Sequence, residues 1–329
     1  MYVWQTDTFN QIIDLQKRNI LPHALLLSSD PGCGIDVMAL HLANALLCEN
    51  SENTLNSKPC GLCRSCKLFK AGTHPDYMIA KPPEGKHILA IDSIREMIDF
   101  VHVTSSFTNK VIVIQPADAM NEASSNAILK ILEEPSDNTF LIMVSTAKHL
   151  LLPTIISRCQ KWHVPIGDHN VTINWLIQET KQDENNVKLA LKQSNFQPIR
   201  AKAFLDNGDL AFQQRVIDGL QQMFKRQISP VQLSTNWQKE NLNQILFWLQ
   251  NWLTTSIKIQ TAKQGDHQVY EANKRIIAFT AKQANPESLF EFYGKVQRYN
   301  LSLNKHQNLN GQLILEDILI GWHNLIEQN

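Results

Sequence analysis

The sequence predicts an α/β domain with a parallel sheet, followed by two helical domains. In the first half of the chain, short apolar runs alternate with stretches of helical periodicity, which is typical of a parallel sheet covered by helices on both faces. After residue 165 the strand patterns stop and helical patterns continue. Glycine accounts for only 12 of 329 residues, which favours helices over a glycine-rich all-β architecture.

Five short segments are predicted as strands, at residues 24–28, 76–80, 111–114, 140–145 and 161–164. Between them, helices are predicted over residues 36–48, from a cap at Asp92, and over residues 121–134, where Pro135 ends the helix. Further helices are predicted over residues 172–180, 185–192, 198–205 and 241–259. The breaker run at residues 206–209 adds a boundary, so we expect domains at residues 1–165, 166–207 and 208–329.

Composition and charge exclude several classes of protein. Hydrophobic residues make up 43% of the chain, which excludes a wholly disordered protein. Lys and Arg number 31, as do Asp and Glu, so the chain lacks the basic excess of a protein that binds nucleic acid alone. No apolar run approaches the length of about 18 residues that a membrane span requires, and no secretory signal is visible. We therefore expect a cytoplasmic protein without a membrane partner.

A loop similar to a nucleotide phosphate loop follows the first predicted strand. Compared with the pattern G-x-x-x-x-G-K-[ST], Ser29 replaces the first glycine, while Gly32 lies within the loop and Gly34 keeps the second glycine. Ile35 stands where the phosphate-binding lysine belongs, and Asp36 where the magnesium-binding hydroxyl belongs. An apolar side chain cannot neutralise phosphate, and a carboxylate favours the positive end of the helix. We expect no functional ATP site here, and we expect Asp36 to help occupy the anion site that ATP would need. From this loop alone, the alternative of an ordinary glycine turn before a helix is equally well supported.

The third predicted strand also ends without the expected chemical groups. Active nucleotide motors place an aspartate, often followed by a glutamate, after this strand, where they support magnesium and orient water. This chain instead has Gln115 and Pro116, with Asp118 two residues further on. Gln115 lacks the charge and Pro116 cannot act as a base. The loss at both places favours a nucleotide-binding fold that does no ATPase work.

Four of the six cysteines fall close together. Cys60, Cys63 and Cys66 are spaced C-x-x-C-x-x-C, and Cys48 lies upstream. Four thiolates at such spacing form a closed tetrahedral zinc site, which contributes folding energy rather than catalysis. An iron–sulfur cluster uses the same ligand type and is the alternative. The other two cysteines are expected to be packed or free thiols.

Three further segments carry a family resemblance: AGTHPDY at residues 71–77, NAILKILEEP at residues 126–135, and Ser157-Arg158-Cys159. Together with the altered phosphate loop, they closely resemble the delta-prime family of bacterial DNA polymerase III clamp-loader subunits. The resemblance is strong over residues 1 to about 165 and rests on organisation alone beyond them. The helix that ends in Leu-Glu-Glu-Pro and the Ser-Arg-Cys triplet are shared with the motor subunits of the same loader, from which the altered phosphate loop separates this chain.

The resemblance implies an AAA+ module with an inserted zinc site, a small helical lid and a helical collar that joins a hetero-pentameric ring. The implied partners are the motor subunits, a delta-type wrench subunit, the sliding clamp and, through the complex, primed DNA. Members of this type do not hydrolyse ATP; they present the arginine of the Ser-Arg-Cys motif, here Arg158, to ATP bound by a neighbouring motor subunit. A guanidinium suits this role because it is permanently charged and presents a fork of donors to phosphate oxygens. The chain would thus be a non-catalytic component of a DNA-directed DNA polymerase (nucleotidyltransferase) holoenzyme.

Two other functions stay open at this point. One is an active ATPase of the same fold, such as a motor subunit of the same loader. The other is a zinc-dependent nucleic-acid-binding module, for which Lys58, Arg64, Lys67 and Lys70 near the cysteines form a modest basic patch.

Overall fold

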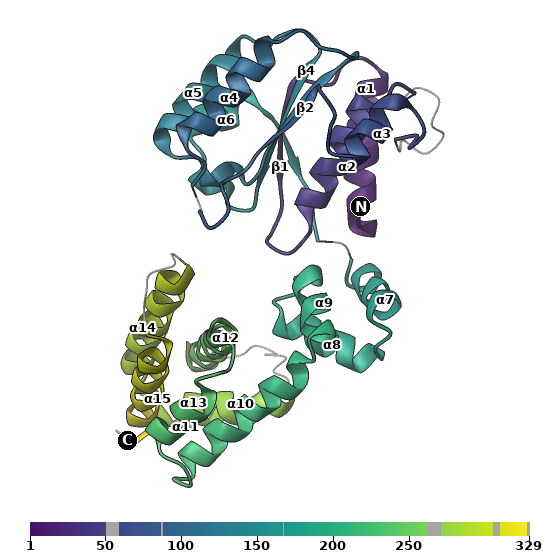
Figure 1. The fold of residues 1–329 in the computed structure, drawn as a ribbon. Helices are drawn as coiled ribbons and strands as arrows, with labels where there is room; N and C mark the ends of the chain where they lie inside the picture. Colours follow the sequence, from purple (N-terminus) through teal and green to yellow (C-terminus); the bar gives the residue numbers. More distant parts are fainter. Residues whose placement is uncertain (51–58, 87, 167, 262–270, 305–309, 328–329) are drawn as a thin grey trace. The chain divides into compact units, whose positions relative to one another are not determined.

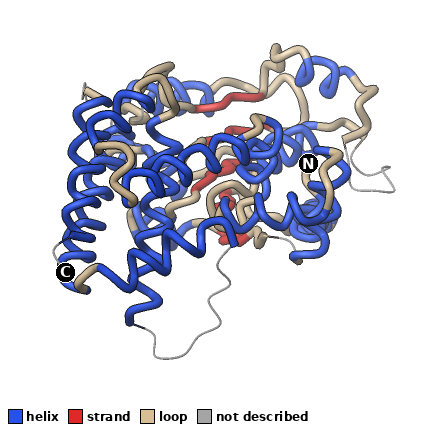
Figure 2. The backbone as a smooth tube through the Cα atoms, turned by 90° about the horizontal axis from the view of Figure 1, so that it is seen from below, coloured by secondary structure: helices blue, strands red, loops and turns tan. Residues whose placement is uncertain are grey.

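The structure, a computed structural model, describes residues 1–50, 59–86, 88–166, 168–261, 271–304 and 310–327. The chain divides into two compact units: Met1–Val187 with Phe196–Lys202, and Lys188–Asn195 with Ala203–Asn329. The strands of the described residues all belong to the first unit, and the second unit is helical (Figure 2). The predicted order, an α/β part followed by a mainly helical part, is confirmed. The finer division of the helical part into a lid and a collar remains a prediction.

The sheet consists of five parallel strands in the order β2-β3-β4-β1-β5. They are β1 (Ala24–Ser28), β2 (Tyr77–Ala80), β3 (Lys110–Ile114), β4 (Thr139–Ser145) and β5 (Gln160–His163). Each agrees with its predicted run to within one residue at either end. In the register of β1, Leu26 lies opposite Met143 of β4 and Lys161 of β5. Because all strands run the same way, the loops that follow β1, β3 and β4 meet at one edge of the sheet.

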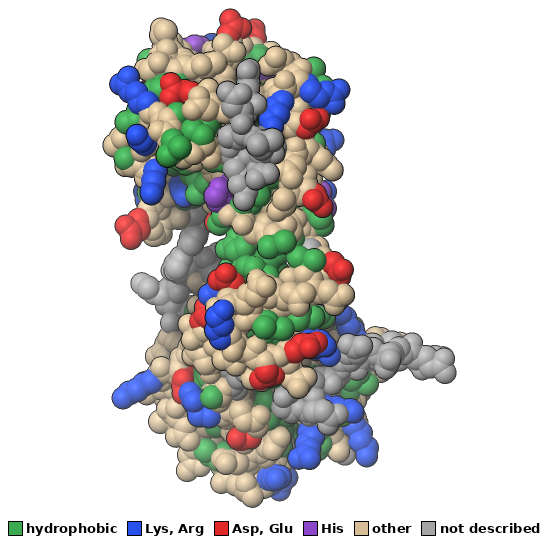
Figure 3. Space-filling model, turned by 90° about the vertical axis from the view of Figure 1, so that its right-hand side faces the viewer, with side chains coloured by type: hydrophobic (Ala, Val, Ile, Leu, Met, Phe, Trp, Pro, Cys, Tyr) green, Lys and Arg blue, Asp and Glu red, His purple; other side chains and the backbone are tan. Residues whose placement is uncertain are grey.

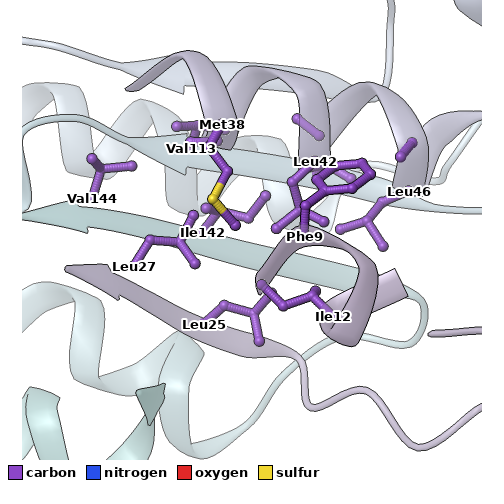
Figure 4. Close-up of a cluster of buried hydrophobic side chains, with 14 of the residues drawn as sticks. Phe9, Ile12, Leu25, Leu27, Met38, Leu42, Leu46, Val113, Ile142 and Val144 are labelled. Carbon is purple, nitrogen blue, oxygen red and sulfur yellow. The ribbon is translucent and has the colours of Figure 1, made fainter. Parts of the chain in front are cut away.

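Helices cover both faces of this sheet (Figure 1). On one face α1 (Thr6–Lys17) and α2 (Ile35–Leu47) pack against Leu25, Leu27 and their neighbours, as Figure 4 shows. On the other face α4 (Ile91–His102), α5 (Glu122–Glu133) and α6 (Pro153–Arg158) pack against Leu26 and the residues that share its side of the strands. The alternation of side chains along each strand thus fills two separate apolar cores, one per face.

Two features of the first unit differ from the sequence prediction. Asp92 does not cap α4: the N-cap is Ala90, and Asp92 lies in the first turn, where its charge still favours the positive helix end. The short 3₁₀ helix Val3–Gln5 and α1 have no counterpart among the predicted elements. The same holds for the short helix α3 (Arg64–Lys70), which follows the cysteine motif.

The remaining helices are α7 (His169–Thr180), α8 (Glu184–Gln193), α9 (Pro198–Asp206), α10 (Asp209–Phe224), α11 (Pro230–Trp237), α12 (Leu242–Thr261), α13 (Glu271–Gln283), α14 (Pro286–Asn304) and α15 (Gly311–Glu327). Trp248 of α12 and Trp322 of α15 are fully buried and form the centre of the core of the second unit. Among the described residues, no helix combines the length and apolar character needed to cross a bilayer.

Candidate functional site

The altered phosphate loop lies at the carboxyl edge of the sheet, between β1 and α2. Gly34 is the N-cap of α2 and has a left-handed backbone with φ +67°, and Gly32 has φ +76°. The amide of Ser29 donates to the carbonyl oxygen of Ser145 at the end of β4, at 3.4 Å. Ile35 is buried at the start of α2, whereas Asp36 is exposed in the first turn. The residue at the lysine position therefore packs into the protein core instead of facing a phosphate site.

Side chains from both sides of the loop press against its glycines. A Cβ atom on Gly34 would lie 2.2 Å from Cε2 of Tyr2 and 2.7 Å from Cδ1 of Ile199. A Cβ atom on Gly32 would lie 2.7 Å from Cβ of Gln197. The amide of Ile199 also donates to the carbonyl oxygen of Gly32, at 3.2 Å. The start of α9 and the N-terminal segment thus occupy the space directly over the loop.

The N-terminal segment also bonds to the loop backbone. The indole N–H of Trp4 donates to the carbonyl oxygen of Cys33 at 2.9 Å. Nε2 of Gln5 donates to the carbonyl oxygens of Cys33 at 2.9 Å and of Gly34 at 2.7 Å. Two of the loop carbonyls are therefore satisfied inside the protein, in a buried environment where such bonds are costly to leave unmade.

Three aromatic rings form a cluster beside the loop, here called the aromatic cluster: Tyr2, Trp4 and Trp175. Tyr2 stacks on Trp4 with ring centroids 4.9 Å apart, and Trp175 of α7 meets both rings edge-on at 5.4 and 5.0 Å. Burial raises the pKa of the Tyr2 hydroxyl, and the nearby charge of Asp36 raises it further. Sequence reasoning missed this cluster because its members lie far from the loop along the chain.

The end of β3 carries two polar side chains whose oxygen atoms are buried. Oε1 of Gln115 and Oδ1 of Asp118 are buried without a hydrogen-bond partner among the described residues, and Pro116 between them is exposed. At the end of β4, Oγ of Ser145 accepts a hydrogen bond from the amide of Ala147 at 3.1 Å and so stabilises the local turn. The predicted loss of nucleotide chemistry at this edge remains a prediction.

The four clustered cysteines are brought together as the sequence predicts. The Sγ atoms of Cys48, Cys60, Cys63 and Cys66 all lie within 4.8 Å of one another, and none of the four forms a disulfide. Sγ of Cys60 is 4.0 Å from Sγ of Cys66, close to the edge of about 3.8 Å that Zn–S bonds of about 2.3 Å give a tetrahedron. Cys48 follows the last residue of α2, and Cys63 is the N-cap of α3. The set fits a closed four-thiolate metal site.

Backbone donors prepare one of these thiols for ionisation. The amides of Cys63 and Leu62 donate to Sγ of Cys60, at 3.3 and 3.5 Å, and lower the pKa of Cys60 to about 6. Burial raises the pKa of Cys48 and that of Cys66. Metal ligation requires the thiolate form, which these backbone donors favour at Cys60.

His74, close to the cysteines in sequence, has a different role. It is buried; its Nδ1 accepts from the amide of Asp76 at 3.1 Å, and its other nitrogen lies 2.9 Å from Oγ of Ser65. Oγ of Ser65 in turn donates to the carbonyl oxygen of Leu47 at 2.6 Å. Burial lowers the pKa of His74, which favours the neutral ring that these bonds require. His74 therefore holds the chain between α3 and β2 and lies outside the cysteine set.

Of the four residues of the proposed basic patch near the cysteines, Lys67 and Lys70 are exposed. Lys58 lies outside the described residues, and the guanidinium of Arg64 lies over the ring of Phe107, 5.8 Å from its centroid. On the face shown in Figure 3, Lys and Arg side chains are interspersed with Asp and Glu within each unit. This distribution agrees with the balanced charge of the chain and gives little support to a nucleic-acid-binding module.

Arg158 lies at the exposed end of a short helix. It is the last residue of α6, and its side chain is 36% exposed. Nη2 lies 2.7 Å from Oε1 of Glu133, and Nη1 donates to the carbonyl oxygen of Thr154 at 3.0 Å. Ser157 donates its hydroxyl to the same carbonyl oxygen at 3.0 Å. Cys159 is buried, which raises the pKa of its thiol to about 12 and agrees with a packed, inert thiol.

Sequence reasoning did not identify the ion pair of Arg158 with Glu133. No local signal relates residues 133 and 158. Their proximity follows from the packing of α5 against α6, in which Ile131, Leu132 and Ile155 share one apolar core.

Comparison with known proteins agrees with this architecture. Residues 4–166 match the family described as DNA polymerase III, delta subunit, and residues 209–324 match DNA polymerase III, delta subunit, C terminal. DNA polymerase III subunit delta' of Pseudomonas aeruginosa is 28% identical over 99% of this chain and 98% of its own length. The proteins of that name are 29% identical in Haemophilus influenzae, over 86% of this chain and 85% of that protein, and 27% identical in Escherichia coli K12, over 97% and 94%. Since the two matched models together cover most of the chain and the relatives named subunit delta' align along most of their own length, the chain belongs to the DNA polymerase III delta-prime family.

Proposed function

We propose that this protein is a non-catalytic subunit of a DNA polymerase III clamp loader. Its curated relatives are named DNA polymerase III subunit delta'. In this role the chain is a component of the polymerase holoenzyme and joins motor subunits and a delta-type wrench subunit in a hetero-pentameric ring. It helps to place the sliding clamp on primed DNA. Residues 166–207 act as the lid and residues 208–329 as the collar.

The chain has no functional ATP site of its own in this proposal. A phosphate loop works because free backbone amides and a lysine charge meet the phosphates. Here Ile35 is buried at the lysine position, and Tyr2 and Ile199 press against Gly34. At the end of β3, Gln115 stands where a magnesium-supporting carboxylate is needed. Both space and charge therefore oppose Mg-ATP, which argues against the alternative of an active motor subunit.

Arg158 acts in trans as an arginine finger on ATP bound by the neighbouring motor subunit, with Ser157 and Cys159 completing its motif. Its contacts with Glu133 and with the carbonyl oxygen of Thr154 use two of the five N–H donors of the guanidinium, so within the described part of the chain three remain for phosphate oxygens. In GTPases such a finger is worth about 10³ to 10⁵ in rate. The observation that carries the proposal is that one chain combines a filled phosphate loop with an exposed, pre-oriented arginine.

The four cysteines hold a structural Zn²⁺ in this proposal. Cys48 ends α2 and Cys63 begins α3, so a shared ion would tie the two helix ends together. A four-thiolate site leaves no open position for water, so the ion supplies folding energy and no chemistry.

Reconstitution of the loader with Arg158→Ala tests the finger role. The variant should assemble normally and lose most of the clamp- and DNA-stimulated ATP turnover. Arg95→Ala is the matched control, because Arg95 is also exposed and paired, with Asp92 at 3.4 Å. Unchanged turnover in Arg158→Ala would remove the finger role.

Calorimetric titration of the isolated chain with Mg-ATP tests the other half of the proposal. We expect no binding in the micromolar range. Micromolar binding with turnover would favour an active ATPase, and tight DNA binding with a steep salt dependence would favour a nucleic-acid-binding module.

A further inference from the structure

Glu133 and Arg158 occupy equivalent positions in two neighbouring helices, since each is the last residue of its helix. In α5 the residue before Glu133 is Leu132, which is 3% exposed; in α6 the residue after Arg158 is Cys159, which is 7% exposed. Both belong to the apolar core between these helices and the sheet. The buried neighbours Leu132 and Cys159 therefore place the two charged side chains next to each other, at the edge of the apolar core.

The contacts fix the guanidinium on one side only. Glu133 accepts from Nη2 at 2.7 Å, and the carbonyl oxygen of Thr154 accepts from Nη1 at 3.0 Å. Each terminal nitrogen of a guanidinium carries two N–H groups, so each keeps one, and Nε–H is also left. The remaining donors form a fork of the kind that matches phosphate oxygens.

The pair contributes little to stability. The Arg158 and Glu133 side chains are 36% and 51% exposed, and ion pairs at such exposure are screened by water and salt. Its main effect is on conformation, because an unpaired arginine of this exposure samples many rotamers and loses that freedom when it binds phosphate.

We propose that Glu133 is a positioning residue for Arg158: its carboxylate and the Thr154 carbonyl oxygen hold the guanidinium in place before the neighbour's ATP arrives. This inference rests on the proposed finger role of Arg158. The contribution is made in the transition state, since the guanidinium must meet the phosphoryl group in one orientation as charge develops. The negative charge of Glu133 offsets part of the attraction of Arg158 for phosphate, but its exposure to water weakens that effect.

Glu133→Gln in the reconstituted loader tests the proposal, because the amide keeps the size of the side chain and removes its charge. The matched control is Glu134→Gln, since Glu134 is the adjacent exposed carboxylate and no ion pair joins it to Arg158 among the described residues. With clamp and primed DNA present, Glu133→Gln should lower kcat for ATP about tenfold, as expected for a mis-set catalytic group, and leave KM for ATP unchanged. Glu133→Asp, which keeps the charge but shortens the reach, should lower kcat in the same way.

The double variant Arg158→Ala/Glu133→Gln should turn over ATP no more slowly than Arg158→Ala alone, because Glu133 acts through Arg158. The melting temperature of the isolated chain should be the same for Glu133→Gln and wild type. Wild-type or faster turnover in Glu133→Gln, or a further loss in the double variant, would overturn the positioning role while the finger role stands. No loss in Arg158→Ala itself would overturn both.

Discussion

Substitution of Gly34 by alanine measures how tightly Tyr2 and Ile199 fill the phosphate loop. The new Cβ would lie 2.2 Å from Cε2 of Tyr2 and 2.7 Å from Cδ1 of Ile199, so both side chains must shift. Overpacking of this kind costs about 1–3 kcal/mol. The backbone at φ +67° adds about 1–2 kcal/mol for any residue other than glycine. We expect Gly34→Ala to lower the free energy of unfolding by about 2–5 kcal/mol.

Gly72→Ala is the control, because Gly72 has φ +73° and nothing lies within 4 Å of its added Cβ. It should lose only the backbone part, about 1–2 kcal/mol. Urea and thermal unfolding, followed by circular dichroism and tryptophan fluorescence, should then separate the two variants by about 1–3 kcal/mol, or about 2–12 °C in a unit of this size. Tyr2→Ala should make Gly34→Ala less costly. Equal effects of Gly34→Ala and Gly72→Ala would refute the filled loop.

Three further outcomes follow from the same structure. Tyr2→Ala should open space at the loop yet leave Mg-ATP binding undetectable by calorimetry, because Ile35 still supplies no charge; micromolar affinity would mean that space alone was lacking. Chelation of zinc, or Cys63→Ser, should lower the melting temperature of the chain, and metal analysis should no longer find one Zn²⁺ per chain. Equal melting temperatures with and without metal would exclude a structural ion. Burial lowers the pKa of His74 below its ordinary value of 6.5, so the contribution of the neutral ring to stability is full above that pH and is lost as the pH falls through the folded-state pKa. Between about pH 7.5 and about pH 5.5, the melting temperature of His74→Gln should therefore fall less than that of the wild type. Parallel melting curves of the two proteins would contradict this.

The sequence predicted those features whose signal is local. Four of the five strands are short apolar runs, whereas β5 alternates half-buried and exposed residues; the C-x-x-C-x-x-C spacing places three ligands within a single loop and helix start. Asp92 misled the prediction of a helix start, because an aspartate is favourable both at the N-cap and in the first turn.

The features that the sequence did not predict depend on tertiary contacts. The bonds from Trp4 and Gln5 to the loop carbonyls join segments that lie about thirty residues apart, and neither segment shows a pattern that points to the other. Glu133 reaches Arg158 only because two helices pack side by side on the sheet. Charge and exposure of single residues are readable in a sequence, but the choice of partner is made by the fold.

Helix α5 has one more consequence. Its N-cap, Asn121, follows the end of β3 with Gln115 and Asp118, and after 12 residues, about 18 Å, it ends at Glu133. A helix of this length is stiff, and its N-terminal end lies close to the place where an active motor subunit would change charge during ATP hydrolysis. If this chain hydrolyses no ATP, as proposed, no charge changes there, and the helix is not displaced from within its own chain. If Arg158 acts as proposed, the timing of ATP hydrolysis is set by how the neighbouring subunit approaches the C-terminal end of α5 and Arg158 beside it, neither of which moves.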